Sequence, residues 1–350
     1  MVVGGGSFGT AVAVVLARGG LRTTLQTRTE QEASTLREDR ENRAYLGGVE
    51  LPRELRVEAA EAGVARADYV FLCVPSTGLR SVIDSLEPRG LSDRGAVISL
   101  AKGLVGPDGD PPTALLTERF GLTRTGCVGG PAHAREMVSA GAGLVAASSS
   151  EPLATAVAGV FVRAGVVCEE SDDPVGVELA GVAKNAAALA SGATVDQGLN
   201  VAGAAAGHIF SEVWRWAFTR GASATSMIGP AGTGDLVATA LAPESRNRRA
   251  GELLAAGVSA EEIAPRVGQA VEALETVPLL AKALQAAGIE APVTSALSKL
   301  IEGALPRDEW IAVVRTTIPP APRRHAAAPP TLWRRLTAWI RRLFHRDQRR

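Results

Sequence analysis

The first twenty residues, MVVGGGSFGTAVAVVLARGG, place a glycine-rich turn between a short apolar run and an Ala/Val-rich helix that ends at a Gly-Gly pair. Gly4, Gly6 and Gly9 form the pattern G-x-G-x-x-G. The first glycine allows a tight turn, the second opens the backbone to a bound group, and the third lets helix and strand pack closely. This beginning constrains the chain to a strand–turn–helix unit, the building block of a parallel α/β sheet.

Further apolar segments of strand length follow this turn, separated by helical or turn-like stretches. Strands that alternate with helices are typical of a doubly wound parallel sheet. We therefore expect residues 1–172 to form an α/β N-terminal Rossmann-like domain. The expected strands after the glycine turn are 22–28, 67–75, 95–103, 126–130, 141–148 and 165–171.

The composition of the chain changes near residue 173. Long Ala-rich helical runs with few β-branched clusters continue to about residue 317, which is typical of helices packed around their own core. The sequence therefore predicts an all-α C-terminal domain over residues 173–317. Residues 318–330 are a Pro/Ala-rich linker, and residues 331–350 are expected to form a basic amphipathic tail helix.

The net charge of zero conceals an uneven distribution of charge. Residues 323–350 carry nine arginines and one aspartate, a net charge of +8, whereas the rest of the chain carries 28 basic and 36 acidic residues, a net charge of −8. This acidic body argues against nucleic acid as a partner. Three scattered cysteines without a CxxC pair, no signal peptide and no apolar run of roughly 18 residues predict a cytoplasmic protein without a metal site.

Lysine is rare in this chain, because only four of the 37 basic residues are lysines and the other 33 are arginines. Lys184 lies in the alanine-rich run ELAGVAKNAAALASG. Arginine cannot replace a lysine that must bring a compact ammonium to a reacting atom or release a proton. Lys184 is therefore a candidate acid. The alternative is a lysine whose stem crosses apolar surface while its charged head reaches water.

A second group of polar residues indicates a phosphate site. The stretch GPAGTGDLVATALAPESRNRRAG contains Asp235, Thr239, Ser245, Arg246 and Asn247. Ser245 can cap the helix that follows, and the first N–H groups of that helix, with Arg246 and Asn247, would bind a doubly charged phosphate ester. A solvated arginine cluster at a helix start is the alternative.

Lys102 lies at the end of a predicted strand, at the edge where open α/β sheets bind ligands. Together with Lys184 and Asp235, it would form one coherent site behind the glycine turn. That turn predicts a bound dinucleotide, whose phosphates would lie on the first N–H groups of the helix. Arg28, about twenty residues past the glycines, suits the 2′-phosphate of NADPH. NADH is the alternative.

In these motifs the chain resembles the NAD(P)H-dependent glycerol-3-phosphate dehydrogenases of the bacterial type over most of residues 1–317. Several ordered motifs are more specific than any one of them. The resemblance implies a Rossmann-like domain followed by a helical domain, as in the 6-phosphogluconate dehydrogenases. The motifs that carry it are GGGSFGTA, NRAYLGGVELP, VFLCVPS, SLAKGL, GPAHAREM, VELAGVAKNAAALASG, AGTGDLVATALAPESRNRRAG and LIEGALP.

The resemblance also implies the residues of the site, with Lys184, Lys102 and Asp235 as the catalytic group. It implies no metal. The implied cofactor-binding residues are Gly4, Gly6, Ser7, Phe8, Gly9, Arg28, Tyr45, Lys102, Ala134, Arg246 and Glu272. The implied substrate-binding residues are Lys102, Gly130, Lys184, Asn185, Asp235, Thr239, Ser245, Arg246 and Asn247.

The reaction implied by the resemblance is the interconversion of dihydroxyacetone phosphate, a small phosphorylated triose, and sn-glycerol 3-phosphate, which feeds glycerophospholipid synthesis. Lys184 would act as general acid/base at the carbonyl oxygen, and Lys102 would polarise the same oxygen. We expect NADPH as cofactor and a homodimer. The alternatives are an NADPH-binding sensor or docking protein with little turnover, and a reductase of related fold that acts on another small ketone.

The chain departs from the family pattern at two places. Ala132 and His133 follow the glycine-proline pair, where Ser, Thr or Asn is usual at the first position. Ala202 and His208 occupy positions that are usually basic. These changes leave open a divergent paralogue with a modified substrate. The aromatic residues that follow are expected in the core or at an interface: Trp214, Trp216 and Phe218.

The predicted tail helix presents two tryptophans and other apolar residues on one side and arginines on the other. This pattern suits peripheral contact with an anionic membrane surface. Docking of the helix on the body or on a partner subunit is the alternative.

Deleting residues 331–350 is expected to release the protein from anionic liposomes and to leave turnover nearly intact, because the deletion removes the basic amphipathic helix and none of the predicted site residues. Co-sedimentation with vesicles of anionic and of neutral lipid measures this. Equal binding of the truncated and full-length proteins to anionic vesicles would contradict the membrane interpretation.

Overall fold

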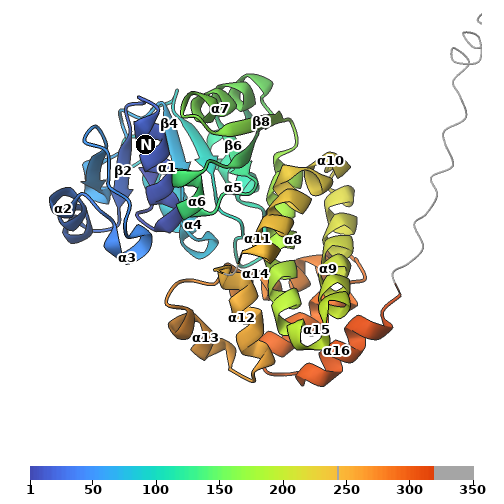
Figure 1. Cartoon of the computed structure of the whole chain (residues 1–350). Coiled ribbons are helices and arrows are strands. Elements are labelled where there is room, and N and C mark those ends of the chain that lie inside the picture. Colours follow the sequence, from blue (N-terminus) through green and yellow to red (C-terminus); the bar gives the residue numbers. More distant parts are fainter. Residues whose placement is uncertain (243, 319–350) are drawn as a thin grey trace, which may run out of the picture. The chain divides into compact units, whose positions relative to one another are not determined.

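The computed structural model describes residues 1–242 and 244–318, so the predicted tail helix and almost all of the predicted linker lie outside the described residues. Residues Met1–Thr317 form one compact unit. The N-terminal part is one sheet in the order β3-β2-β1-β4-β5-β6-β7-β8, and Figure 1 labels β2, β4, β6 and β8 in it. Its strands are β1 (Val2–Val3), β2 (Thr24–Thr27), β3 (Arg56–Ala59), β4 (Tyr69–Leu72), β5 (Ala96–Ser99), β6 (Thr125–Gly129), β7 (Gly143–Ala147) and β8 (Val167–Ser171).

Neighbouring strands of this sheet are parallel with one exception, since β7 runs antiparallel to β6. The sheet is therefore mostly parallel, as predicted, with one antiparallel step that was not predicted. The segment between β6 and β7 is short and packs its helix α6 (Ala134–Ser139) against α1 (Ser7–Arg18). The chain reverses direction across this connection, so β7 enters the sheet antiparallel to β6. Strand β3 was not predicted, and the other strands lie at the predicted positions.

Helices cover both faces of the sheet. Successive side chains of a strand point to opposite faces, so each central strand contributes to the packing on both sides. Phe71 and Ile98 pack on one face against apolar residues of α1 and α7, whereas Val70, Leu72 and Val97 pack on the other face against α4 and α5. This two-sided burial is typical of a doubly wound sheet. The remaining helices of this part are α2 (Glu30–Asp39), α3 (Arg43–Leu46), α4 (Ser76–Leu86), α5 (Pro112–Phe120), α7 (Glu151–Arg163), η1 (Ala60–Ala62) and η2 (Leu122–Arg124).

The chain after β8 is helical throughout its described residues, which confirms the predicted fold class of an α/β sheet followed by an all-α region (Figure 1). None of the described helices is long and apolar enough to span a membrane. The helices are α8 (Pro174–Ala193), η3 (Val195–Gln197), α9 (Leu199–Thr219), α10 (Ala224–Ile228), η4 (Pro230–Gly234), α11 (Asp235–Leu241), α12 (Arg246–Ala255), α13 (Ala260–Val267), α14 (Glu272–Ala286), α15 (Pro292–Ile301) and α16 (Arg307–Thr316).

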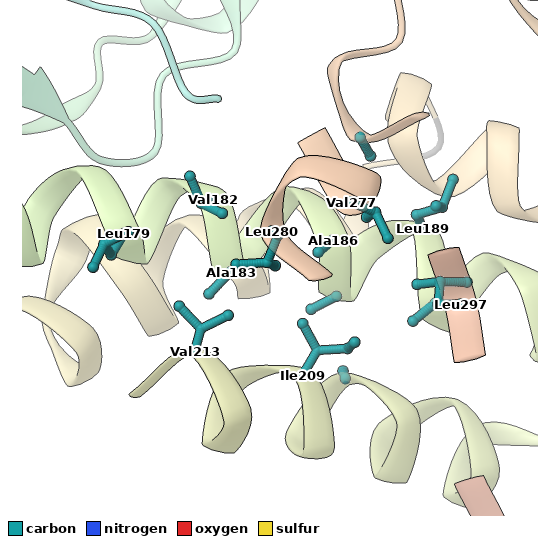
Figure 2. Close-up of a cluster of buried hydrophobic side chains, with 14 of the residues drawn as sticks. Leu179, Val182, Ala183, Ala186, Leu189, Ile209, Val213, Val277, Leu280 and Leu297 are labelled. Carbon is teal, nitrogen blue, oxygen red and sulfur yellow. The ribbon is translucent and has the colours of Figure 1, made fainter. Parts of the chain in front are cut away.

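Helix α8 is the centre of the helical region and is buried along almost its whole length. Its leucines, valines and alanines pack against apolar side chains of α9, α14 and α15 (Figure 2). A Cβ atom on Gly192 would lie 2.1 Å from the Arg248 carbonyl, and one on Gly251 would lie 2.1 Å from the Leu189 carbonyl. Glycine is therefore required where α8 and α12 cross, because their backbones almost touch.

The aromatic residues of α9 were expected in the core or at an interface. Trp216 is buried in the core of the helical region, where the Arg220 guanidinium lies 5.0 Å from its ring centroid. Trp214 packs against the core and lies 5.7 Å from Phe218, whose side chain is exposed. The prediction is confirmed for Trp216.

Two buried glutamates cap helices that lie far from them in the sequence. Glu178 of α8 accepts hydrogen bonds from the backbone N–H and the hydroxyl of Thr113, at the start of α5. Glu212 of α9 accepts bonds from the backbone N–H groups of Val293 and Thr294, at the start of α15. Both α5 and α15 begin with proline, and each glutamate satisfies N–H groups that the helix itself leaves unpaired.

Burial raises the pKa of Glu178 to about 8, although the hydrogen bonds from Thr113 act in the opposite direction. The folded state holds this proton more tightly than the unfolded chain, in which the pKa is near 4.5. The stabilising contribution is therefore fully present below pH 4.5 and is lost as the pH rises towards 8.

Glu178→Gln is expected to remove this part of the pH dependence, because glutamine keeps an oxygen acceptor for Thr113 and has no proton to lose in this range. Urea unfolding of the parent and the variant at several pH values measures the difference in free energy of unfolding. An identical dependence on pH in both proteins would contradict the assigned pKa.

Candidate functional site

Lys102 follows β5 at the carboxyl end of the strand, the edge at which the sequence predicts a ligand. Its Nζ donates to Asp235 Oδ2 at 2.6 Å and to the Gly130 carbonyl at 2.8 Å. Gly130 comes directly after β6, and Asp235 is the first residue of α11. The ammonium of Lys102 therefore joins two neighbouring strand ends to a helix of the C-terminal region.

Lys184 lies in the middle of α8 and is only 6% exposed. Its Nζ lies 3.4 Å from Asp235 Oδ2, the oxygen that also binds Lys102. The interpretation of Lys184 as a surface lysine with its head in water is therefore wrong. One turn earlier on α8, a Cβ atom on Gly181 would lie 3.6 Å from Lys102 Cβ. The segment that carries Lys102 therefore packs against the helix at ordinary van der Waals distance.

The two ammonium groups share one buried carboxylate, and this arrangement sets their electrostatics. Burial lowers the pKa of Lys184 to about 8, while Asp235 acts to raise it and Lys102 acts to lower it. Burial alone would raise the pKa of Asp235, but Lys102 and Lys184 together hold it below its ordinary value. Asp235 therefore stays ionised, and Lys184 is an ammonium from which a proton leaves readily near neutral pH.

The glycine turn has the form required to accept a dinucleotide. A Cβ atom on Gly4 would lie 2.5 Å from the Cys73 carbonyl and one on Gly9 would lie 2.0 Å from the Gly4 carbonyl, whereas one on Gly6 would meet no atom within 4 Å. The first and third glycines are thus required by packing, and the second faces open space. No side chain caps α1 at Gly6, so the first N–H groups of the helix are left for a phosphate.

Apart from Arg246 on α12 and Glu272 on α14, the other cofactor residues implied by the resemblance lie around this turn or along the same sheet edge. Ser7 and Phe8 are the first residues of α1, and Lys102 Nζ lies 5.9 Å from the centroid of the Phe8 ring. This contact places the lysine pair beside the dinucleotide turn. Arg28 is exposed just after β2, and Tyr45 on α3 is also exposed. Ala134 is the first residue of α6.

The predicted phosphate-binding residues lie at the start of α12. The Ser245 side chain accepts from Arg248 N at 3.3 Å, which is the predicted helix cap. Arg246 is exposed and donates to the Ala270 carbonyl at 3.0 Å. Thr239 donates to Asp235 Oδ1 at 3.4 Å, so its hydroxyl supports the carboxylate shared by the lysines.

The remaining predicted residues form a hydrogen-bonded chain beside the lysines. Asn185 of α8 contacts Asn247 of α12 and Glu272 of α14, and Asn247 Oδ1 accepts from the Ala273 N–H at 3.2 Å. Each of these side chains was predicted to bind cofactor or substrate. The structure brings them together with Lys102, whose carbonyl is also bound by Asn185.

Two polar residues at the site were not predicted as site residues. Asn42 is buried, and its Nδ2 donates to the Gly5 carbonyl and to Thr10 Oγ1, each at 2.8 Å, so it braces the glycine turn. His133 precedes α6. The pKa of its imidazole is lowered, mainly by burial and secondly by the nearby charge of Lys184. The signal for His133 was the one that identified Lys102, namely a polar residue shortly after the carboxyl end of a strand.

Two family models match the chain along most of its length. The model described as NAD-dependent glycerol-3-phosphate dehydrogenase N-terminus matches residues 1–154, and the model described as NAD-dependent glycerol-3-phosphate dehydrogenase C-terminus matches residues 173–312. The first contains the glycine turn and Lys102, and the second contains Lys184 and Asp235.

Individual proteins give the same result. The glycerol-3-phosphate dehydrogenase (NAD(P)+) of Deinococcus radiodurans is 38% identical over 316 residues, which cover 88% of this chain and 90% of that protein. That of Moorella thermoacetica is 35% identical over 320 residues, covering 89% and 94%. The crystal structure of glycerol-3-phosphate dehydrogenase from Coxiella burnetii superposes with a TM-score of 0.85 at 26% identity, covering 90% of this chain and 98% of that one.

Asp235→Asn is expected to lower the pKa of Lys184 below about 8, because it removes the negative charge that opposes the effect of burial. Protein labelled at lysine should give four lysine resonances in an NMR titration, which makes the assignment tractable. The resonance of the exposed Lys299 serves as internal reference. An unchanged titration of Lys184 would contradict its pairing with Asp235.

Proposed function

The chain belongs to the NAD-dependent glycerol-3-phosphate dehydrogenase family, and on this basis we propose that it interconverts dihydroxyacetone phosphate and sn-glycerol 3-phosphate, with Lys184 as general acid and base. The observation that carries the proposal is the cluster of buried Lys184 and Asp235 with partly buried Lys102 beside the glycine turn. The N-terminal turn fits a dinucleotide, and NAD(P)H when bound supplies the hydride for the carbonyl carbon.

Lys184 has the properties that proton transfer to the ketone oxygen requires. Negative charge develops on this oxygen as the carbonyl is reduced, and a positioned ammonium both stabilises the charge and gives up a proton. Burial brings the pKa of Lys184 to about 8, close to neutral pH, where a proton donor is most effective. In the reverse direction the neutral amine accepts the proton from the alcohol.

Lys102 and Asp235 support this step in different ways. Asp235 holds both ammonium groups on one carboxylate oxygen, so their separation is restricted before substrate binds. The ammonium of Lys102 lies beside that of Lys184 on the same carboxylate and would polarise the same ketone oxygen. The preorganised charges need little rearrangement during the reaction, which is the main advantage of a buried polar site over water.

The start of α12 is the proposed site of the substrate phosphate. Ser245 caps this helix, and the first-turn N–H groups together with Arg246 present positive charge to an anion. Binding the phosphate away from the reacting carbon would orient the carbonyl towards Lys184. Arg28 after β2 favours NADPH over NADH because a guanidinium binds a 2′-phosphate. The product would feed glycerophospholipid synthesis.

Lys184→Ala is expected to lower kcat for dihydroxyacetone phosphate about 10²- to 10⁴-fold, the usual contribution of a general acid. Oxidation of NADPH, and of NADH for comparison, is followed by absorbance. Lys282→Ala is the matched control, because Lys282 is an exposed lysine on α14. Full activity of Lys184→Ala would contradict the assigned role.

The same assay separates the alternative functions. A parent protein that binds NADPH and oxidises none of it with several phosphorylated ketones would be a sensor. A parent protein that reduces another small ketone in preference to dihydroxyacetone phosphate would be a reductase with a different substrate.

A further inference from the structure

A buried amide lies next to the catalytic lysine and is used entirely within the protein. Asn185 is 1% exposed. Its Nδ2 donates to the Lys102 carbonyl at 3.1 Å and to Glu272 Oε2 at 3.0 Å, and its Oδ1 accepts from Asn247 Nδ2 at 2.8 Å. Both N–H groups of this amide are therefore occupied, and neither is left to donate to a substrate.

We propose that Asn185 is a positioning residue that fixes Lys102 in the site. The inference rests on the proposed function, in which Lys102 polarises the ketone oxygen. This positioning role replaces the direct contact with substrate that the resemblance implies for Asn185.

The position of Lys102 in the chain explains why it needs such support. Lys102 lies beyond the end of β5, outside the hydrogen-bonded ladder of the sheet. Its ammonium is held by Asp235 and by the Gly130 carbonyl, and its backbone carbonyl is held by Asn185. The residue is thus fixed at both ends, although it belongs to a connecting segment of a kind that is usually mobile.

Helix α8 supplies both of the contacts that place the two lysines relative to each other. Lys184 contacts Asp235, and its neighbour in sequence, Asn185, holds the backbone of Lys102. One cation, Lys184, therefore lies on this buried helix, and the next residue of the same helix, Asn185, holds the backbone of the residue that carries the other. A shift of about 1 Å in a reacting group can cost about 10² in rate, so this restraint matters for catalysis.

The asparagine satisfies all of the partners at this position. Two acceptors, the Lys102 carbonyl and the Glu272 carboxylate, face the Nδ2 group, and one donor, the Asn247 amide, faces Oδ1. Aspartate has no donor for the two acceptors, and alanine has neither donor nor acceptor. Glutamine has the same groups on a side chain that is longer by one methylene.

The same amide also links helices, so a purely structural role must be distinguished from positioning. Through Glu272 and Asn247, Asn185 joins α8 to α14 and α12. The double variant Asn185→Asp/Glu272→Gln separates the two roles. It conserves net charge, and it lets the new glutamine amide donate to the new carboxylate, which restores the link to α14. It cannot restore the bond to the Lys102 carbonyl.

The experiment compares the full-length parent protein, Asn185→Ala and the double variant. Three quantities are measured: kcat and KM for dihydroxyacetone phosphate, Tm, and the four lysine resonances of protein labelled at lysine. Thr294→Val is the stability control, because it removes a buried hydrogen bond to Glu212 of 2.6 Å in another part of the helical region. The resonances of the exposed Lys282 and Lys299 serve as internal references, and the thermal unfolding transition reports whether each variant is folded.

We expect Asn185→Ala to lower Tm and to lower kcat about 10²-fold, with a much smaller change in KM. The double variant should regain most of the lost Tm and little of the lost kcat, and the Lys102 resonance should remain displaced from its position in the parent protein. Thr294→Val should lower Tm without moving the Lys102 resonance. Recovery of kcat together with Tm in the double variant would overturn the proposal, as would a parent-like Lys102 resonance in Asn185→Ala.

Failure of the proposed function would be visible separately. A parent protein that does not reduce dihydroxyacetone phosphate would contradict that function before any variant is compared. The lysine resonances would then still decide whether Asn185 fixes Lys102, because this measurement does not depend on turnover.

Discussion

The sharing of one buried carboxylate by two ammonium groups is the interaction on which the site depends. Asp235 is fully buried, and the isolated charge would be costly there without Lys102 and Lys184. Since one lysine comes from the end of a strand and the other from the central helix, the carboxylate also ties the sheet to the helical region. The contact that tunes the pKa of the proposed proton donor, Lys184, is therefore also one that holds the site together.

The close packing around α8 is connected with the burial of these charges. A lysine can be buried in the middle of a helix only if the neighbouring segments approach closely enough to offer partners. The small residues of α8 permit close approach, as the contact of Gly192 with the Arg248 carbonyl illustrates. The run of small residues around Lys184 is thus the physical condition for the cluster of charges beside it.

Much of this arrangement could be predicted from the sequence, because its signals are local. The glycine turn, the alternation of strands and helices, and the rarity of lysine identify the fold and the two lysines. The antiparallel β7, strand β3 and the bracing role of Asn42 could not be predicted, since they depend on tertiary packing. Asn185 was placed at the site, but its partners Glu272 and Asn247 are 87 and 62 residues away in the chain. No local pattern reveals that its donors are already used.

The most direct test of the central claim is a crystal structure with NADPH and dihydroxyacetone phosphate bound, in which the distance from Lys184 Nζ to the ketone oxygen is measured. The proposed chemistry requires that distance to lie within hydrogen-bond reach, about 2.6–3.2 Å, with Asp235 still bound to both lysines. A ketone oxygen that is bound by other groups, with Lys184 Nζ beyond reach of it, would contradict the role of Lys184 as proton donor.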